Sequence, residues 1–333
     1  MINNRKIACL KNYLGVLSAI KAPYMLRMHD TLPPTPLKIF LEHAVVLFFI
    51  VLLLLTGCVK SKNNEIIKNE VKRVVSTAPS NTEIIVDLGQ AHKLAAIDVH
   101  SANIEGIPAN LPLLDFFYPD AEVIINLEPD LIIASGHNPT GSGEDPFRLL
   151  REMGIPVVYI SMSKSIMDIY RDIALIAELL QAGEEGKTLI REMTTQVTEI
   201  AENGKNISNR KTVYFEISAA PDMMTFGKDS FIHDMIITIG AVNIFENENW
   251  LVTPGAEAII NRNPDVILTN VNYIDDPIAE IKSRPGFNHI NAVKNNRIYQ
   301  IDTDSSVRPS ARIALALRQM QEAVYPEEIY GKE

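Results

Sequence analysis

The stretch Glu122-Val-Ile-Ile-Asn-Leu-Glu-Pro-Asp-Leu-Ile-Ile-Ala-Ser135 decides the fold, because a second copy of it occurs later in the chain. The second copy, Glu257-Ala-Ile-Ile-Asn-Arg-Asn-Pro-Asp-Val-Ile-Leu-Thr-Asn270, is identical at seven of fourteen positions and begins 135 residues downstream. In each copy a short helical segment ends at a Pro-Asp break. An apolar run then follows that suits a strand covered on both faces, at Leu131–Ala134 and Val266–Thr269. The repeat predicts two α/β lobes of similar topology.

The sequence around the two copies predicts further strands in each half. Apolar runs at Pro156–Ile160 and Arg297–Ile301 follow the two copies, and Thr212–Ile217 opens the second half. The C-terminal segment Ser310–Val324 has the spacing of an amphipathic helix. Each half therefore has the strands and helices of a small α/β unit.

Between the halves, apolar residues recur at helical spacing. Two helices are expected, at about Ile166–Leu180 and about Glu184–Glu202, with Gly183 separating them and Gly204 ending the second. At ~1.5 Å per residue the second helix is about 30 Å long. A helix of that length can connect two lobes stiffly.

The composition excludes several classes of protein. The 333 residues are 47% hydrophobic and 22% charged, which is typical of a globular chain. A net charge of −10 disfavours a nucleic-acid-binding surface. The two cysteines, Cys9 and Cys58, are too few for a disulfide framework or a zinc site of their own.

The N-terminal region reads as a leader. Ala44–Leu55 is a twelve-residue apolar run, too short to span a bilayer but suited to the core of a signal peptide. The next residues, Leu55-Thr-Gly-Cys58, resemble the lipobox of bacterial lipoproteins, in which the cysteine is lipidated. The alternative is a short membrane helix with an incidental cysteine. Because 43 residues precede the apolar run, Met25 or Met28 is an alternative start.

Five motifs follow one another along the chain: Arg73-Val-Val-Ser-Thr-Ala-Pro-Ser-Asn-Thr-Glu83, Asn126-Leu-Glu-Pro-Asp-Leu-Ile132, Met153-Gly-Ile-Pro-Val-Val158, Thr225-Phe-Gly-Lys-Asp-Ser230 and Gly240-Ala-Val-Asn-Ile-Phe245. In order and spacing they resemble the class III solute-binding proteins of ABC importers for cobalamin, haem and ferric siderophores. The resemblance runs from about Arg73 to Tyr325. It implies two α/β lobes with central sheets, joined by one long interlobe helix, with a ligand cleft between the lobes.

The expected organisation has five parts. They are a leader with a lipoprotein signal peptide at 1–57, a tether at 58–72, an N-terminal α/β lobe at 73–162, a helical region with the interlobe helix at 163–210, and a C-terminal α/β lobe at 211–333.

Glu122 and Glu257 begin the two copies of the repeat. The resemblance implies that one glutamate per lobe docks onto arginine pockets of the two permease subunits, and these positions match. The alternative is a glutamate that simply stabilises the first turn of a helix through the dipole.

The ligand is expected to contact loops at the carboxyl ends of the strands, where open α/β sheets generally bind. Arg308 either binds an anionic ligand through bidentate hydrogen bonds from its guanidinium or forms an ion pair with Asp304, four residues away. The expected ligand-binding residues are Ser80, Asn81, Phe116, Phe117, Tyr118, His137, Phe226, Trp250, Tyr273, Asp304 and Arg308.

The function expected from the resemblance is capture without catalysis. The ligand is an iron complex (a ferric siderophore or haem), and the alternative is a corrinoid. The cobalamin-binding member of the family brackets its ligand with several tryptophans. At the matching positions this chain has Phe116, Ser135 and Leu251 instead. No cofactor and no bare-metal site are expected, because the histidines are scattered. Lipid on Cys58 would anchor the protein at the outer face of the cytoplasmic membrane or in the periplasm. A surface sensor or a secreted α/β enzyme remains as an alternative of another class.

Overall fold

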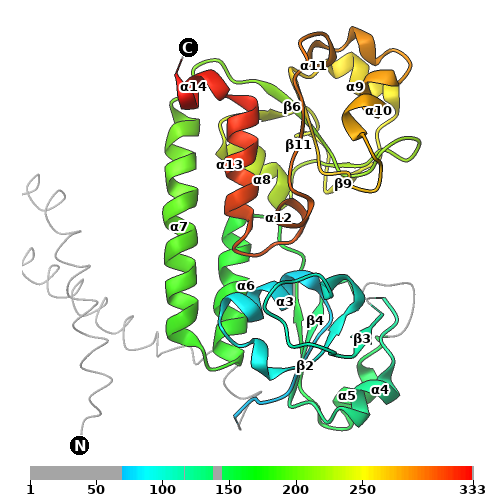
Figure 1. The fold of residues 1–333 in the computed structure, drawn as a ribbon, viewed down its shortest axis with the longest axis vertical. Helices are drawn as coiled ribbons and strands as arrows, with labels where there is room; N and C mark the ends of the chain where they lie inside the picture. Colours follow the sequence, from blue (N-terminus) through cyan, green and yellow to red (C-terminus); the bar gives the residue numbers. More distant parts are fainter. Residues whose placement is uncertain (1–69, 116, 138–144, 332–333) are drawn as a thin grey trace, which may run out of the picture. The chain divides into compact units, whose positions relative to one another are not determined.

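Two parallel sheets, each flanked by helices, make up the part of the chain that the structure describes (Figure 1). The structure is a computed structural model that describes residues 70–115, 117–137 and 145–331, all within the unit Glu65–Glu333. Cys58, Phe116 and most of the tether expected at 58–72 lie outside the described residues. No helix in the described ranges is both long and apolar enough to cross a bilayer.

The N-terminal lobe is built on a five-stranded parallel sheet with the strand order β3-β2-β1-β4-β5. Every residue of β1, β2 and β4 is buried, as expected for strands covered on both faces. The strands are β1 (Val74–Ser76), β2 (Leu94–Asp98), β3 (Leu113–Leu114), β4 (Leu131–Ser135) and β5 (Val157–Ile160). The helices between them are α3 (Pro79–Asp87), η3 (Ala91–Lys93), η4 (Val99–Ser101), α4 (Ala121–Asn126) and α5 (Arg148–Glu152).

The C-terminal lobe has a four-stranded parallel sheet in the order β11-β10-β6-β8, and a separate antiparallel pair, β7 with β9. The strands are β6 (Thr212–Glu216), β7 (Thr225–Phe226), β8 (Val242–Asn243), β9 (Leu251–Val252), β10 (Val266–Thr269) and β11 (Ile298–Gln300). The helices are α8 (Phe231–Thr238), α9 (Ala256–Arg262), α10 (Pro277–Ser283), η6 (Phe287–His289), α11 (Asn291–Lys294), α12 (Thr303–Val307), α13 (Ile313–Val324) and α14 (Pro326–Tyr330).

The sequence repeat corresponds to a structural repeat. In each copy a helix (α4 or α9) leads into a central strand (β4 or β10), and that strand pairs with the first strand of its lobe (β1 or β6). The aspartate of each Pro-Asp break ties the turn to that first strand. Asp130 accepts the backbone N–H groups of Lys72 and Arg73, both at 2.8 Å, while Asp265 accepts the N–H of Thr212 at 3.0 Å. The strands predicted from the repeat are confirmed.

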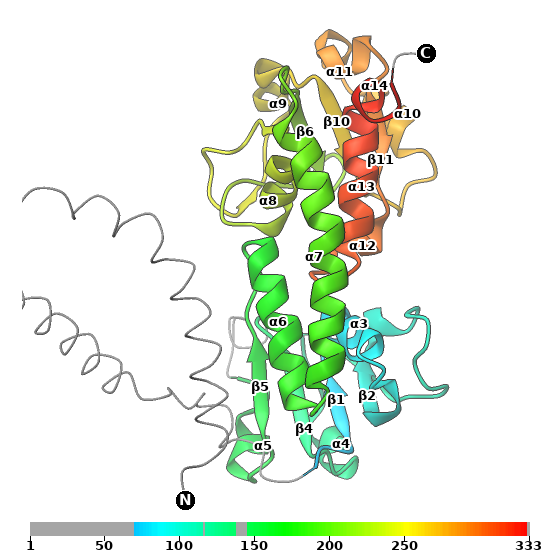
Figure 2. The same ribbon diagram turned by 90° about the vertical axis from the view of Figure 1, so that its left-hand side faces the viewer.

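Two helices lie side by side along the lobes, and the longer of them, α7, runs from one lobe to the other (Figure 2). They are α6 (Ile166–Leu179) and α7 (Gly183–Lys205), close to the predicted ranges. The 23 residues of α7 span about 34 Å. Near its start, Gly186 lies against Leu88 of the N-terminal lobe, and near its end Gly204 meets Gly240 of the C-terminal lobe. The predicted two-lobe α/β fold with one long interlobe helix is confirmed.

Gly204 does not end α7, contrary to the prediction. It lies inside the helix, which runs to Lys205 and is capped at Asn206. A Cβ at Gly204 would overlap the backbone oxygen of Thr238, where the helix crosses the end of α8. The glycine is needed there for close approach of two backbones rather than for a helix stop.

The largest hydrophobic core passes through both lobes. It joins Val74 of the N-terminal sheet to Ile173 of α6, Met193 of α7 and Val213 of the C-terminal sheet. The other faces of the two sheets carry separate, smaller cores. The helical layer therefore packs against both sheets, and the lobes share one core.

Candidate functional site

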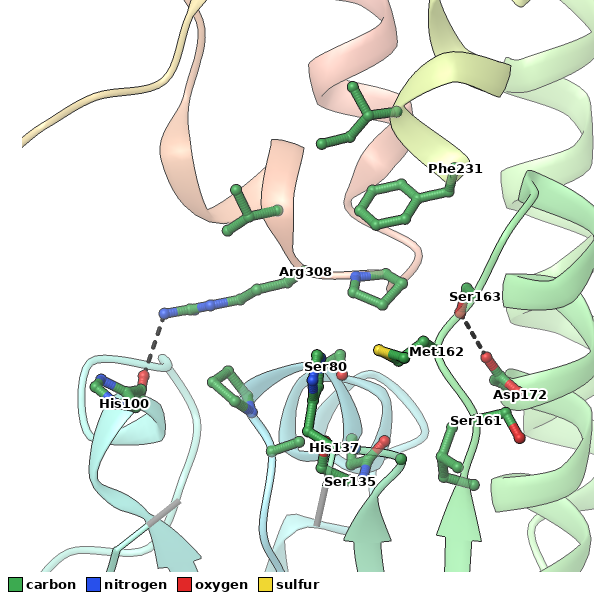
Figure 3. Close-up of a pocket in the computed structure, with 18 of the residues that line it drawn as sticks. Ser80, His100, Ser135, His137, Ser161, Met162, Ser163, Asp172, Phe231 and Arg308 are labelled. Carbon is green, nitrogen blue, oxygen red and sulfur yellow. Dashed lines mark hydrogen bonds between the residues drawn. The ribbon is translucent and has the colours of Figure 1, made fainter. Parts of the chain in front are cut away.

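A cavity of about 580 Å³ opens between the carboxyl ends of the strands of the two lobes (Figure 3). Its volume lies within the range usual for small-molecule sites. The residues that follow β1, β4 and β5 contribute from one lobe, and those that follow β6 contribute from the other. In the N-terminal sheet, β1 and β4 are neighbours where the strand order reverses, which is the usual place for a ligand in an open α/β sheet.

The first turn of α3 forms one wall of the cavity. Pro79 occupies the first helical position, and the preceding Ala78 is extended and offers no side-chain cap. Ser80 and Asn81 follow, and both line the cavity. Asn81 is 1% exposed, and its side-chain Nδ2 has no hydrogen-bond partner. This wall therefore presents unpaired donor capacity beside the cavity.

The residues after β4 and β5 continue the same side of the cavity. Ser135 and His137 follow β4, and Met162 and Ser163 follow β5. Burial lowers the pKa of His137, so its ring is neutral at pH 7. Figure 3 shows these side chains below the C-terminal lobe.

An aromatic wall faces them from the C-terminal lobe. Phe226 of β7 and Trp250, just before β9, meet edge to face with ring centroids 5.2 Å apart. Trp250 has a φ of +51°, which is unusual for a bulky residue. Two backbone hydrogen bonds hold it there: its N–H donates to Lys228 O, and its carbonyl accepts the N–H of Gly227, both at 2.8 Å. The strained backbone fixes the indole at the cavity.

Arg308 crosses from the C-terminal lobe to the N-terminal lobe (Figure 3). Its Nη1 lies 2.8 Å from Oε1 of Glu83, a residue of α3 that is 0% exposed. Its Nη2 lies 3.0 Å from Oδ1 of Asp304 and donates to the backbone oxygen of His100 at 3.2 Å. The ion pair with Asp304 considered from the sequence is therefore present.

Further hydrogen bonds complete this interlobe network. Arg308 Nη2 also donates to Oδ1 of Asn103 at 3.1 Å, and Asn103 Nδ2 donates to Asp304 at 3.0 Å. The hydroxyl of Ser310 donates to the second oxygen of Glu83 at 2.7 Å. Both oxygens of Glu83 are thus satisfied by groups from the opposite lobe.

Asp172 on α6 is a lining carboxylate that lies beside Ser163 (Figure 3). Burial raises the pKa of Asp172 to about 6, although the hydroxyl of Ser163, which donates to its Oδ2 at 2.8 Å, favours the charged form. The folded protein therefore binds this proton more tightly than the unfolded chain, in which the value is 3.8. Stability contributed by protonated Asp172 is lost as the pH rises from about 4 to about 6.

Asp172→Asn is therefore expected to raise the free energy of unfolding at about pH 8 by roughly 1–3 kcal/mol, and by much less at about pH 4. Asparagine can keep the hydrogen bond to Ser163 without the buried charge. Urea unfolding at the two pH values measures the difference.

Asp168→Asn, one turn earlier on α6, is the matched control with the opposite sign. Burial acts to raise the pKa of Asp168, but hydrogen bonds from Ser165 and Lys164 and the charge of Arg171 lower it overall. This variant should lose stability at about pH 8. Equal changes at both pH values in Asp172→Asn would contradict the effect assigned to its burial.

The cavity brings together most of the ligand-binding residues expected from the sequence. Tyr118, which is 79% exposed, and Tyr273 do not line it. The hydroxyl of Tyr273 instead accepts the backbone N–H of Ala219 at 2.8 Å. The expected residues that do line the cavity are Ser80, Asn81, Phe117, His137, Phe226, Trp250, Asp304 and Arg308.

Met162, Phe231 and Asp172 are among the lining residues that the sequence analysis did not identify. Met162 follows the predicted strand that became β5, so the strand-end rule would have found it. Phe231 begins α8, and Asp172 lies in the middle of α6, where no sequence signal marks it as facing a cavity. Asp304 lies in the short helix α12 rather than in a loop.

Glu122 and Glu257 occupy equivalent places in the two lobes. Each is exposed and lies in the first turn of its helix, α4 or α9. Both helices lie on the side of the molecule away from α7 (Figure 1).

Within the described ranges, no group of three or more His, Cys, Asp or Glu residues is arranged to hold a metal ion.

Comparison with known proteins gives consistent matches across both lobes. A model of the periplasmic binding protein family matches residues 74–305, from β1 into α12. YvrC, an ABC transporter substrate-binding lipoprotein of Bacillus subtilis (strain 168), is 32% identical over 269 residues, which cover 80% of this chain and 84% of the relative. A vitamin B12-binding protein of Vibrio parahaemolyticus (serotype O3:K6, strain RIMD 2210633) is 25% identical over 248 residues, which cover 74% and 87%.

A solved structure matches to a similar extent. It is the crystal structure of a possible iron-binding (periplasmic solute-binding) protein from Staphylococcus epidermidis ATCC 12228. It superposes with a TM-score of 0.69 at 31% identity, and the match covers 77% of this chain and 100% of the other. The residues 74–305 that the family model matches include the start of α3 and the aromatic wall of the cavity.

Proposed function

This chain belongs to the periplasmic binding protein family, and from that membership we propose that it captures an iron complex, a ferric siderophore or haem, and delivers it to an ABC permease. The observation that carries the proposal is the cavity between the lobes, which combines an aromatic wall at Phe226 and Trp250 with a polar wall at the start of α3. A large metal chelate presents both apolar surface, which suits the aromatic wall, and polar atoms, which suit the polar wall. Capture and release require no catalytic step.

A corrinoid is the second candidate ligand. It is favoured by the vitamin B12-binding relative of Vibrio parahaemolyticus, which matches over most of the length of both chains. The possible iron-binding protein of Staphylococcus epidermidis favours iron at higher identity. All these ligands are metal chelates, so one set of probes tests them together.

The proposed partners are the permease and the membrane. Glu122 and Glu257 would each meet a basic pocket on one of the two permease subunits, a role that their equivalent, exposed positions support. Lipid on Cys58 would hold the protein at the outer face of the cytoplasmic membrane or in the periplasm, and the lipoprotein relative in Bacillus subtilis supports this anchor. Two acyl chains anchor a protein stably, whereas one does not.

Ligand binding is expected to quench the fluorescence of Trp250, the only tryptophan of the chain, because its indole lines the cavity. Residues 59–333 are titrated with a ferric trihydroxamate, a ferric tris-catecholate, hemin and cyanocobalamin, each corrected for absorbance. Trp250→Phe should remove the signal, while ultrafiltration still detects bound chelate. Tyr273→Phe, off the cavity, serves as the control. If ultrafiltration retains none of the four chelates, the proposed function is wrong.

A further inference from the structure

The cavity has a single permanent cation in its described lining, Arg308. That charge is already neutralised within the protein. Glu83 and Asp304 lie 2.8 Å and 3.0 Å from its guanidinium nitrogens, and the guanidinium also donates to His100 O and Asn103 Oδ1. An incoming anion would have to compete with two carboxylates that are already hydrogen-bonded to it.

Besides Arg308, the ionisable side chains of the described lining are two carboxylates and two histidines, His100 and His137. Asp172 and Asp304 are the two lining carboxylates. Burial lowers the pKa of His137, which removes positive charge from that ring at pH 7.

The other electropositive features of the described lining are two helix N-termini, those of α3 and α8, whose first residues line the cavity. Each helix N-terminus carries the equivalent of about half a positive charge. Arg308 is already paired with two carboxylates and Asp172 adds a third, so these two half charges do not reverse the sign of the cavity. Asn81 Nδ2 adds an unpaired donor, which suits a carbonyl oxygen of the ligand.

The aromatic wall adds to this preference. Phe226 and Trp250 both line the cavity, and the face of an aromatic ring attracts a cation rather than an anion. An anionic group moved from water into such a cavity loses its hydration without gaining a counter-ion. A neutral amphipathic chelate loses little and gains contact with the rings.

Resting on the proposed function, we infer that this cavity selects metal chelates with no net negative charge, neutral or cationic, and rejects strongly anionic ones. Among ferric siderophores it would accept hydroxamate complexes and reject tris-catecholates.

The test compares two chelates of the same metal. Binding of a ferric trihydroxamate and of a ferric tris-catecholate is measured by Trp250 fluorescence and by ultrafiltration. The trihydroxamate is expected to bind at least about tenfold more tightly. A tris-catecholate that binds as tightly or more tightly overturns the inference and leaves the proposed function intact. If none of the four chelates binds, hemin and cyanocobalamin included, the proposed function and the inference both fail.

Asp304→Asn tests the electrostatic cause. The Asp304 side chain is 38% exposed and its removal leaves Arg308 paired with Glu83, so the variant is expected to fold. Losing one lining carboxylate should raise the affinity for the tris-catecholate, relative to the affinity for the trihydroxamate, by roughly threefold or more. Asp275→Asn, an exposed aspartate outside the lining, is the matched control. An unchanged ratio of the two affinities in Asp304→Asn overturns the inference.

Discussion

Arg308→Met is expected to lower the free energy of unfolding by about 3–5 kcal/mol, because it leaves the carboxylate of Glu83 buried without its counter-ion. Glu83 is 0% exposed, and the remaining hydroxyl of Ser310 satisfies one of its two oxygens. Methionine keeps most of the length and volume of the arginine stem, so the loss measures charge rather than packing. Urea unfolding followed by circular dichroism gives the value.

Two further variants identify the cause. Arg171→Met removes an exposed ion pair with Asp168, in which the arginine side chain is 72% exposed, and should cost less than about 1 kcal/mol. The double variant Glu83→Gln with Arg308→Met removes both buried charges and should recover a large part of the lost stability. If Arg308→Met is no more destabilising than Arg171→Met, the buried pair does not hold the lobes together.

The partner of Arg308 shows why the site was only partly predictable. The ion pair with Asp304 is visible in the sequence, because the two residues are four apart. The pair with Glu83 joins residues 225 positions apart on different lobes, and no local pattern encodes it. The sequence therefore suggested that Arg308 binds an anionic ligand, whereas in the fold its charge is already paired with Glu83.

The fold was more predictable than the site because its signals are local. The repeat placed β4 and β10, since a proline break followed by a buried apolar run is specified within about ten residues. The close crossing of Gly204 with Gly240 depends on two helices meeting in space, so the glycine was misread as a helix stop. Tyr273 was expected at the cavity because it follows a strand end, but its hydroxyl binds a neighbouring loop.

The equivalence of Glu122 and Glu257 leads to the second large effect. A ligand in the cavity contacts neither residue, since neither lines it. A permease with two matching subunits can contact both, one in each lobe. Replacing either carboxylate by lysine would place like charges together in the proposed interface, which costs several kcal/mol. Ligand binding and transport should therefore respond differently to the same substitution.

Glu122→Lys and Glu257→Lys are each expected to reduce uptake by the transporter reconstituted in vesicles by about tenfold or more, and the double variant should transport less than either. Chelate affinity, measured by Trp250 fluorescence, should stay within about twofold of that of the unchanged protein. Both glutamates are exposed and lie outside the cavity lining, so salt screens their charges from the ligand. Glu105→Lys, in the segment that packs on α3, and Glu246→Lys reverse exposed charges elsewhere on the same two lobes and should leave uptake unchanged. Normal transport by Glu122→Lys and Glu257→Lys, or an equal loss in the two controls, would show that the permease does not bind these two glutamates.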